Sequence, residues 1–305
     1  MKLFKRSPPA AALPDGYLTY FTSAQARDFR RLVGNSFALV GRDVTVHTDH
    51  VEDRSGTKFG LWNIGALCAG VDTREWPGLV DDHVRRVTTP PTELGNLSDE
   101  EFETGLCLRM VEVSALPNLE LLGYVRPVAP GLVEVLSVDL PDAVATPLGD
   151  ELLARGPLSK LLVLGRANLR HLLESDAIAA ADVEANGGRF TSVTGDSFFT
   201  ASLALILPEA LAHFSGEDDF GRGVLVAVPH RHQLLYRLVD GPDAALALEA
   251  MFSIARPAYY EESGPLSPHV YWVRNHRWSQ ATSIERGRAR VQTTAQLARA
   301  LEPFE

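Results

Sequence analysis

The chain of 305 residues contains 45% hydrophobic and 22% charged residues, and a chain of this length and composition can bury a core without disulfides or structural metals. Its 39 acidic residues exceed its 29 Lys and Arg residues, which gives a formal net charge of −10. Because such a charge repels phosphate backbones, we expect no nucleic-acid partner. No apolar run of about 18 residues occurs, so we expect no membrane span.

The first residues predict a flexible tail over residues 1–16, because they are rich in Pro, Ala and charge. The chain begins like a signal peptide, but Pro8 and Pro9 follow where a continuous apolar stretch would be needed. The two cysteines, Cys68 and Cys107, have apolar neighbours, which is typical of buried thiols rather than of a secreted disulfide framework. We therefore expect a cytoplasmic protein.

Helix and strand signals over residues 17–148 predict an N-terminal lobe. Thr22 and Gln25 have the spacing of a capping box, which marks the start of a helix. Residues 44–48 alternate as a strand does, and residues 59–69 are predicted to be the partner strand in a hairpin. The remaining predicted elements of this lobe are a helix over 76–87, a short helix capped at Ser98, and strands over 106–113, 119–128 and 132–138.

Residues 149–280 predict a C-terminal lobe in which helices alternate with strands. Its predicted elements are helices from 158, over 197–214 and over 244–254, and strands over 189–193, 224–239 as a hairpin, and 270–274. The apolar run 224–228 is typical of a strand buried on both faces. The predicted fold class is α+β, with two lobes that are each a mostly antiparallel sheet with helices packed against it; one large domain is the alternative. Residues 281–305 are expected to form a tail with a short helix.

Several segments of the second lobe carry a resemblance to a known family. They are Ala-Asn-Leu at 167–169, residues 196–204, Val-Ala-Val-Pro-His at 226–230 with Leu-Leu at 234–235, and residues 260–268 before an aromatic strand. Over about residues 150–278 the chain resembles the YtpQ-like family of uncharacterised bacterial proteins, and the likeness is fainter over 59–87 and 106–116. The resemblance implies a compact bacterial protein of the cytoplasm and implies no catalytic residues.

The tripeptide Gly195-Asp196-Ser197 lies where esterases of the Gly-Asp-Ser type present their nucleophile, after a strand and before a helix. Those enzymes also need a histidine base three residues after an Asp, and none of the nine histidines has an Asp at that spacing. Helix capping by Asp196 or Ser197 is the simpler interpretation. The sequence also lacks a dinucleotide fingerprint, a phosphate-binding loop and a zinc-protease motif.

Two dense histidine clusters are the candidates for a metal site. The first comprises His47, Asp49 and His50, and the second comprises His230 and His232. If residues 47–50 continue one strand, alternation sends the two imidazoles of the first cluster to opposite faces. The second cluster is expected in the turn that begins at Pro229, where imidazoles are usually solvated. We therefore expect no metal and no cofactor.

The aromatic residues near the end of the second lobe are the candidate interface: Tyr259, Tyr260, Tyr271 and Trp272. Amphipathic rings are enriched where proteins meet, and core packing is the alternative. Together with the missing catalytic motifs, this predicts a non-catalytic protein-binding or scaffold protein of bacteria, with another protein as its partner. The competing prediction is a hydrolase or metal-dependent enzyme that uses Asp196, Ser197, His230 and His232. The sequence does not specify an oligomeric state.

Overall fold

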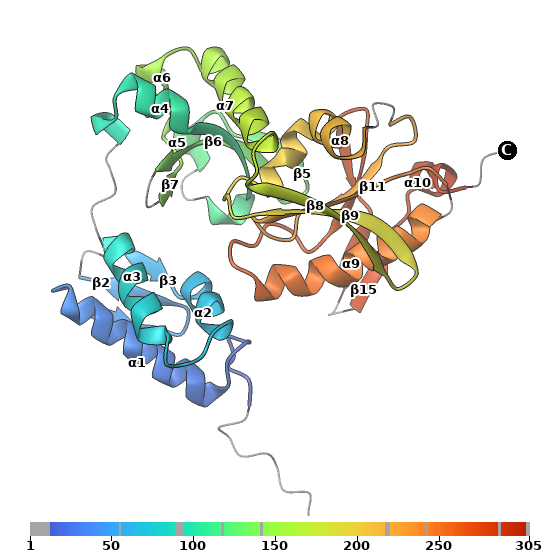
Figure 1. Ribbon diagram of the computed structural model, residues 1–305. Coiled ribbons are helices and arrows are strands. Elements are labelled where there is room, and N and C mark those ends of the chain that lie inside the picture. The colour runs from blue at the N-terminus through green and yellow to red at the C-terminus, as the bar shows by residue number, and fades with distance from the viewer. Residues whose placement is uncertain are drawn as a thin grey trace, which may run out of the picture. The chain divides into compact units, whose positions relative to one another are not determined.

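The computed structural model describes residues 13–54, 56–88, 94–116, 119–140, 143–216, 220–241, 243–285 and 288–302. The chain divides into two compact units: unit 1 comprises residues 1–91 and 261–263, and unit 2 comprises residues 92–260 and 264–305. Helices pack against antiparallel sheets (Figure 1), which confirms the predicted α+β class.

Unit 1 is a small sheet with three helices. Its elements are α1 (Ser23–Leu39), β1 (Val44–Val46), β2 (His50–Asp53), β3 (Lys58–Gly60), α2 (Trp62–Ala69) and α3 (Trp76–Thr88). The strands pair antiparallel in the order β1-β2-β3. Buried side chains of the three helices and of β2 form one core, including Phe29, Val51, Ile64 and Trp76.

The start of unit 1 is held by side-chain hydrogen bonds. Thr22 and Gln25 form the predicted capping box of α1. Asp15 makes two hydrogen bonds to the guanidinium of Arg30, at 2.7 and 2.9 Å. Residues 13–16 therefore belong to unit 1, whereas residues 1–12 of the expected tail lie outside the described residues.

The hairpin predicted in unit 1 has a different second strand. The partner of β1 is β2, and the predicted strand 59–69 is divided between β3 and the helix α2. A short apolar run does not distinguish a strand from a buried helix, and here Ile64, Gly65 and Cys68 share the buried face of a helix.

The first half of unit 2 is a four-stranded sheet with short helices. Its elements are η2 (Leu94–Asn96), α4 (Asp99–Gly105), β4 (Leu106–Glu112), η3 (Val113–Ala115), α5 (Leu119–Leu122), β5 (Arg126–Ala129), β6 (Leu132–Leu140), β7 (Ala143–Ala145), α6 (Gly149–Arg155) and α7 (Leu158–Leu173). The sheet has the order β4-β6-β5, and β7 also pairs with β6. Ser98 and Glu101 form the predicted capping box of α4.

The second half is built on a six-stranded antiparallel sheet of order β13-β12-β10-β11-β9-β8. Its strands are β8 (Ile178–Ala185), β9 (Gly188–Gly195), β10 (Val224–Ala227), β11 (Gln233–Leu238), β12 (Val270–Arg274) and β13 (Arg277–Gln280). The other elements are η4 (Ala201–Ile206), α8 (Leu207–Ser215), α9 (Asp243–Glu261), β14 (Thr282–Glu285), β15 (Arg288–Val291) and α10 (Ala295–Ala300). The predicted helix 197–214 is thus a 3₁₀ segment followed by a shorter α-helix.

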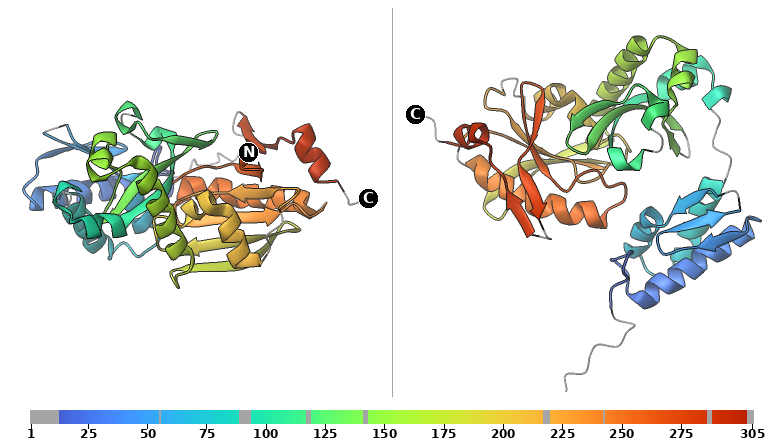
Figure 2. Two further views of the ribbon diagram at one scale, coloured as in Figure 1. Left: turned by 90° about the horizontal axis from the view of Figure 1, so that it is seen from above. Right: turned by 180° about the vertical axis from the view of Figure 1, so that it is seen from behind.

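The alternation of side chains along β10 separates two cores. Leu225 and Ala227 face the core that contains α9 and α10. Val224 and Val226 face the core that contains the four-stranded sheet, α7, η4 and α8. All four side chains are buried, which confirms that this strand is covered on both faces. Seen from above, α7 lies where the two sheets of unit 2 meet (Figure 2).

The boundary between the units lies near residue 91, not near residue 148 as the sequence had indicated. The reason is the close approach of α7 to β4. A Cβ at Gly165 of α7 would lie 2.8 Å from the side chain of Leu136 and 3.1 Å from the amide of Leu108, so a larger residue here would push α7 away from β4. The four-stranded sheet therefore shares its core with the second half of the chain. The expected C-terminal tail also contributes α10 to unit 2.

Candidate functional site

The β12–β13 hairpin closes in a tight two-residue turn. Asn275 and His276 connect the strands, and both have left-handed backbones, with φ of 48° and 60°. Asparagine is favoured at the first of these positions and glycine at the second, so the side chain of His276 has a small conformational cost. The register places Arg274 directly opposite Arg277. Like charges at opposed positions destabilise a ladder, so two local features of this hairpin oppose folding.

Two further arginines join this pair around one groove. The arginine groove has a volume of about 870 Å³ and is lined by Arg222, Arg274, Arg277 and Arg299, with Trp272 among the other lining residues. Among the residues that the structure describes, no carboxylate lines it. The guanidinium carbon of Arg274 lies 5.9 Å from the centre of the Trp272 ring, within range of a cation–π interaction. The arrangement attracts anions.

The wall of the arginine groove is fixed by backbone contacts. Arg222 donates hydrogen bonds to the carbonyl oxygens of Ala300 and Glu302, at 3.2 and 2.7 Å. The indole Nε1 of Trp272 donates to the carbonyl of Arg222 at 3.0 Å. A Cβ at Gly223, where φ is 92°, would lie 2.5 Å from that same Nε1, so glycine is required for this close approach.

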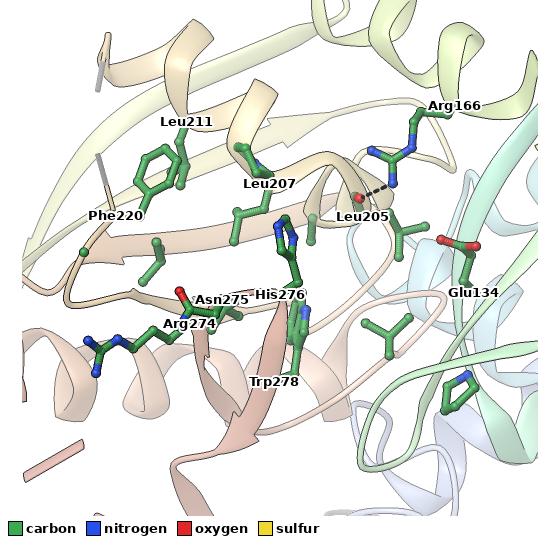
Figure 3. A pocket seen from close by; sticks show the side chains of 17 residues that line it. Glu134, Arg166, Leu205, Leu207, Leu211, Phe220, Arg274, Asn275, His276 and Trp278 are labelled. Carbon is green, nitrogen blue, oxygen red and sulfur yellow. Dashed lines mark hydrogen bonds between the residues drawn. The ribbon is translucent and has the colours of Figure 1, made fainter. Parts of the chain in front are cut away.

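An apolar groove of about 660 Å³ lies on the other face of the same hairpin, against Val273 and Trp278, and meets the arginine groove at Arg274 and Asn275. Figure 3 shows His276 and Trp278 one above the other in the middle, with Arg166 and Glu134 at one end and Arg274 at the other. Its remaining walls carry mostly apolar side chains, among them Leu205, Leu207, Leu211 and Phe220. Arg166 is held by a hydrogen bond to the carbonyl of Leu205 at 3.3 Å. This groove suits large apolar side chains.

The predicted nucleophile and base do not form a catalytic pair. Ser197 Oγ accepts a hydrogen bond from the amide of Phe199 at 3.1 Å. His232 Nδ1 lies 3.1 Å from the carbonyl of Gly195, and its Nε2 accepts from Arg231 at 2.9 Å. These contacts assign the neutral Nδ1–H tautomer and leave no imidazole nitrogen to take a proton from Ser197. Ser197 therefore caps a turn.

The neighbourhood of His230 and His232 disfavours positive charge. Burial lowers the pKa of His230 from 6.5 to about 4, and it also lowers the pKa of His232. Burial lowers the pKa of Arg231 as well, to about 10, and its guanidinium lies 4.0 Å from the centre of the Phe198 ring. The two imidazole centres are 6.3 Å apart. These imidazoles are structural and neutral near pH 7.

In unit 1, the predicted placement of His47 and His50 on opposite faces is wrong. The chain turns at residues 48–49, and the amide of His47 donates to the carbonyl of His50 at 2.8 Å. The two rings stack with their centres 4.4 Å apart. Asp49 Oδ1 lies 2.7 Å from His50 Nδ1, and this hydrogen bond lowers the pKa of the Asp49 carboxyl. A tight turn therefore brings together residues that a continuous strand would separate.

The aromatic candidates are mainly core residues. Tyr271 and Trp272 are 0% and 4% exposed, so they do not form the expected exposed surface. The Tyr271 hydroxyl lies 2.8 Å from Ser267 Oγ and 3.0 Å from the carbonyl of Pro130, to which it donates. Tyr260 is 47% exposed, whereas burial raises the pKa of the partly buried Tyr259 to about 12. Only Tyr260 of the four presents a large exposed area.

No family model, curated protein or solved structure matches the chain. The resemblance to the YtpQ-like family therefore stays a prediction. Within the described residues, no helix combines the length and the apolar character that crossing a bilayer requires.

The sequence interpretation missed Arg222, Arg274, Arg277 and Arg299. Arg222 and Arg299 are distant from the hairpin in the chain, and only the fold brings them together. One local signal was present: Asn275-His276 lies between two segments with strand character, and Asn is a favoured first residue of a two-residue hairpin turn.

Proposed function

We propose that this chain is a non-catalytic binding protein that holds an acidic, partly apolar segment of another protein along the β12–β13 hairpin. The observation that best supports this proposal is the pair Arg274 and Arg277, which lie opposite each other on the two strands. Arg222 and Arg299 line the same groove, and no described carboxylate does. The chain as a whole carries a net charge of −10, so this concentration of positive charge is local.

Carboxylates of a bound segment would remove the cost of the opposed arginines. Guanidinium groups bind carboxylates through paired, charge-assisted hydrogen bonds. Neither Arg277 nor Arg299 has a described carboxylate within 4.0 Å, although thirteen arginine–carboxylate pairs occur among the other described residues. Acidic side chains therefore offer these two groups the partners that the described part of the chain does not.

The apolar groove would bind the apolar side chains of the same segment. A ligand with acidic groups alone would use only the arginine groove, whereas a peptide can alternate acidic and apolar side chains along its length. The two grooves lie on opposite faces of the hairpin and meet at Arg274 and Asn275, so a segment that bends around the turn can reach both. Apolar burial supplies affinity, and the arginines supply orientation and a fast association rate.

We also propose that this chain is a bacterial, cytoplasmic protein of the YtpQ-like family. It is supported by the resemblance of residues 150–278 and by the free thiols of Cys68 and Cys107, which are both buried. Free cysteines without disulfides are typical of reducing compartments. We do not extend the proposal to a hydrolase, because Ser197 and His232 have hydrogen-bond partners other than each other.

The test is fluorescence anisotropy with a labelled peptide of alternating Glu and Leu. We expect saturable binding that weakens as salt increases, because exposed charge pairs are screened. The double variant Arg274→Gln/Arg277→Gln should bind at least about tenfold more weakly, which corresponds to about 1.4 kcal/mol. Arg189→Gln is the matched control, since Arg189 is exposed on β9, at the opposite side of the sheet from β13.

Three results would contradict the proposal. One is equal binding of a peptide of alternating Lys and Leu, and another is an unchanged affinity in the double variant. The third is displacement of the peptide by a single-stranded oligonucleotide or by inorganic phosphate at equal concentration of charge, which would assign the grooves to a phosphate ligand. The competition is run in the same buffer, because the affinity of phosphate ligands depends on salt.

A further inference from the structure

The turn between β1 and β2 in unit 1 gathers three potential metal ligands. The imidazole rings of His47 and His50 stack at 4.4 Å with an angle of 15° between their planes. Glu52 lies two residues after His50 on the same strand, so its side chain points to the same face. One oxygen of Glu52 is 3.7 Å from His47 Nε2 and 3.6 Å from His50 Nε2.

These distances are close to those of a metal site. One ligand atom from each of the three side chains lies within 4.8 Å of the other two. Zn–N and Zn–O bonds of about 2.0–2.2 Å at tetrahedral angles place ligand atoms about 3.3–3.6 Å apart. The stacked imidazoles would converge on one point after rotation about χ2, a torsion with broad wells.

The groups around the three ligands favour an ordered site. Asp49 accepts a hydrogen bond from Nδ1 of His50 at 2.7 Å, which leaves Nε2 as the nitrogen directed at Glu52. A carboxylate behind a metal-binding imidazole fixes its tautomer and makes it a stronger donor. The carbonyl of Thr48 in the turn accepts from Arg30 at 2.7 and 3.0 Å, and Asp15 holds that guanidinium.

One buried nitrogen of the cluster lacks a hydrogen bond to any described residue. Nε2 of His50 is inaccessible to solvent and has no hydrogen-bond partner within the part of the chain that the structure describes. A buried polar atom without a partner destabilises the fold. A cation coordinated by this nitrogen would remove that cost, and the partly exposed His47 and Glu52 leave it a path from solvent.

We propose that His47, His50 and Glu52 bind one divalent transition-metal ion of the Zn²⁺ class. Two imidazoles with one carboxylate suit Zn²⁺ better than Mg²⁺ or Ca²⁺, which prefer oxygen ligands. Three protein ligands leave the fourth tetrahedral position to water or to a group of a partner. The site is in unit 1 and is independent of the proposed peptide binding in unit 2.

Metal binding is measured on the full chain after dialysis against a chelator, by isothermal titration with ZnCl₂. We expect one strong site per chain. The single variants His47→Gln, His50→Gln and Glu52→Gln should each weaken it at least tenfold, while His171→Gln, an exposed histidine of α7, should leave it unchanged.

Co²⁺ provides a second readout that does not depend on affinity. The wild-type chain should give the intense visible absorption of a four-coordinate ion, and His47→Gln and His50→Gln should lose it while keeping their circular dichroism spectrum. The proposal is overturned if zinc does not saturate at one equivalent, if His171→Gln weakens binding as much as the three ligand variants, or if the cobalt spectrum is that of the six-coordinate aqueous ion.

Discussion

The two histidine clusters look alike in sequence, but they have opposite environments in the structure. In unit 1, His47 and His50 stack beside the carboxylates of Asp49 and Glu52. In unit 2, His230 and His232 lie further apart, and Arg231 donates to His232. The first environment favours a cation between the imidazoles and the second disfavours one. The charge of the neighbouring side chains, rather than the density of histidines, decides what a cluster can bind.

The largest expected effect is acid destabilisation through His230. Its folded-state pKa is about 4, against 6.5 for the free side chain, so between these values the unfolded chain takes up a proton that the folded chain does not. Stability is unaffected above pH 6.5 and should fall by about 2–3 kcal/mol as the pH drops to about 4.

Urea denaturation of wild type and His230→Gln at about pH 7.5 and about pH 4.5 measures this loss. The variant should lose less stability on acidification than wild type, and His171→Gln should behave as wild type. Equal losses in wild type and His230→Gln would show that folding does not lower the pKa of His230, and the contrast between the clusters would be weakened.

A smaller effect is expected where the turn of the first cluster is anchored. Asp15→Asn removes the charge that Arg30 pairs with, and both side chains are largely buried. We expect unit 1 to lose about 2 kcal/mol of stability. Because Arg30 holds the pKa of the Asp15 carboxyl far below its usual range, the stabilisation is present above about pH 4 and is lost as the pH falls below it.

Thermal denaturation at neutral pH compares Asp15→Asn with Asp28→Asn, whose ion pair with Arg31 is exposed. The control should change little, because exposed ion pairs contribute little to stability. If both variants melt at the wild-type temperature, the hydrogen bonds from Arg30 to Thr48 do not depend on Asp15.

The variant Arg231→Met tests how much the neighbouring charge contributes to the environment of His232 in unit 2. It removes a charge that lowers the pKa of His232, so that pKa should rise, as followed by NMR of the imidazole protons. It also removes the cation–π contact with Phe198, at a cost of about 1 kcal/mol. An unchanged pKa of His232 would mean that burial alone sets it.

The smallest effect is expected from Glu52→Gln without metal. Its contacts to the two imidazoles are long and partly exposed, so stability should change by less than about 0.5 kcal/mol. Zinc should raise the melting temperature of the wild type more than that of the variant, because a ligand stabilises the state that it binds. A large loss without zinc would make Glu52 a structural residue.

Local signals in the sequence predicted local structure well. The capping boxes at Thr22 and Ser98 and the buried strand β10 are confirmed, because a few neighbouring residues determine each of them. The predicted position of the lobe boundary differs from that in the structure, because the contact of Gly165 with β4 joins segments about sixty residues apart. Sequence periodicity carries no information about such a contact.

For the candidate sites too, the sequence predicted what neighbouring residues determine and missed what depends on long-range contacts. The sequence identified His47, Asp49 and His50, but it placed them on one strand, and the turn that unites them depends on the pairing of β1 with β2. Glu52 was missed because its place beside the imidazoles follows from that register. The arginine groove needs β12, β13 and α10 to be assembled first.

The two free cysteines are distributed one to each unit. Cys68 is in the core of unit 1 and Cys107 is in a core of unit 2, at 0% and 6% exposure. Burial raises their pKa values to about 11 and about 12, so the folded chain offers reagents almost no thiolate. Each thiol should react only when its own unit opens. The rates of alkylation at the two positions therefore report the opening of the two units separately, without any added label.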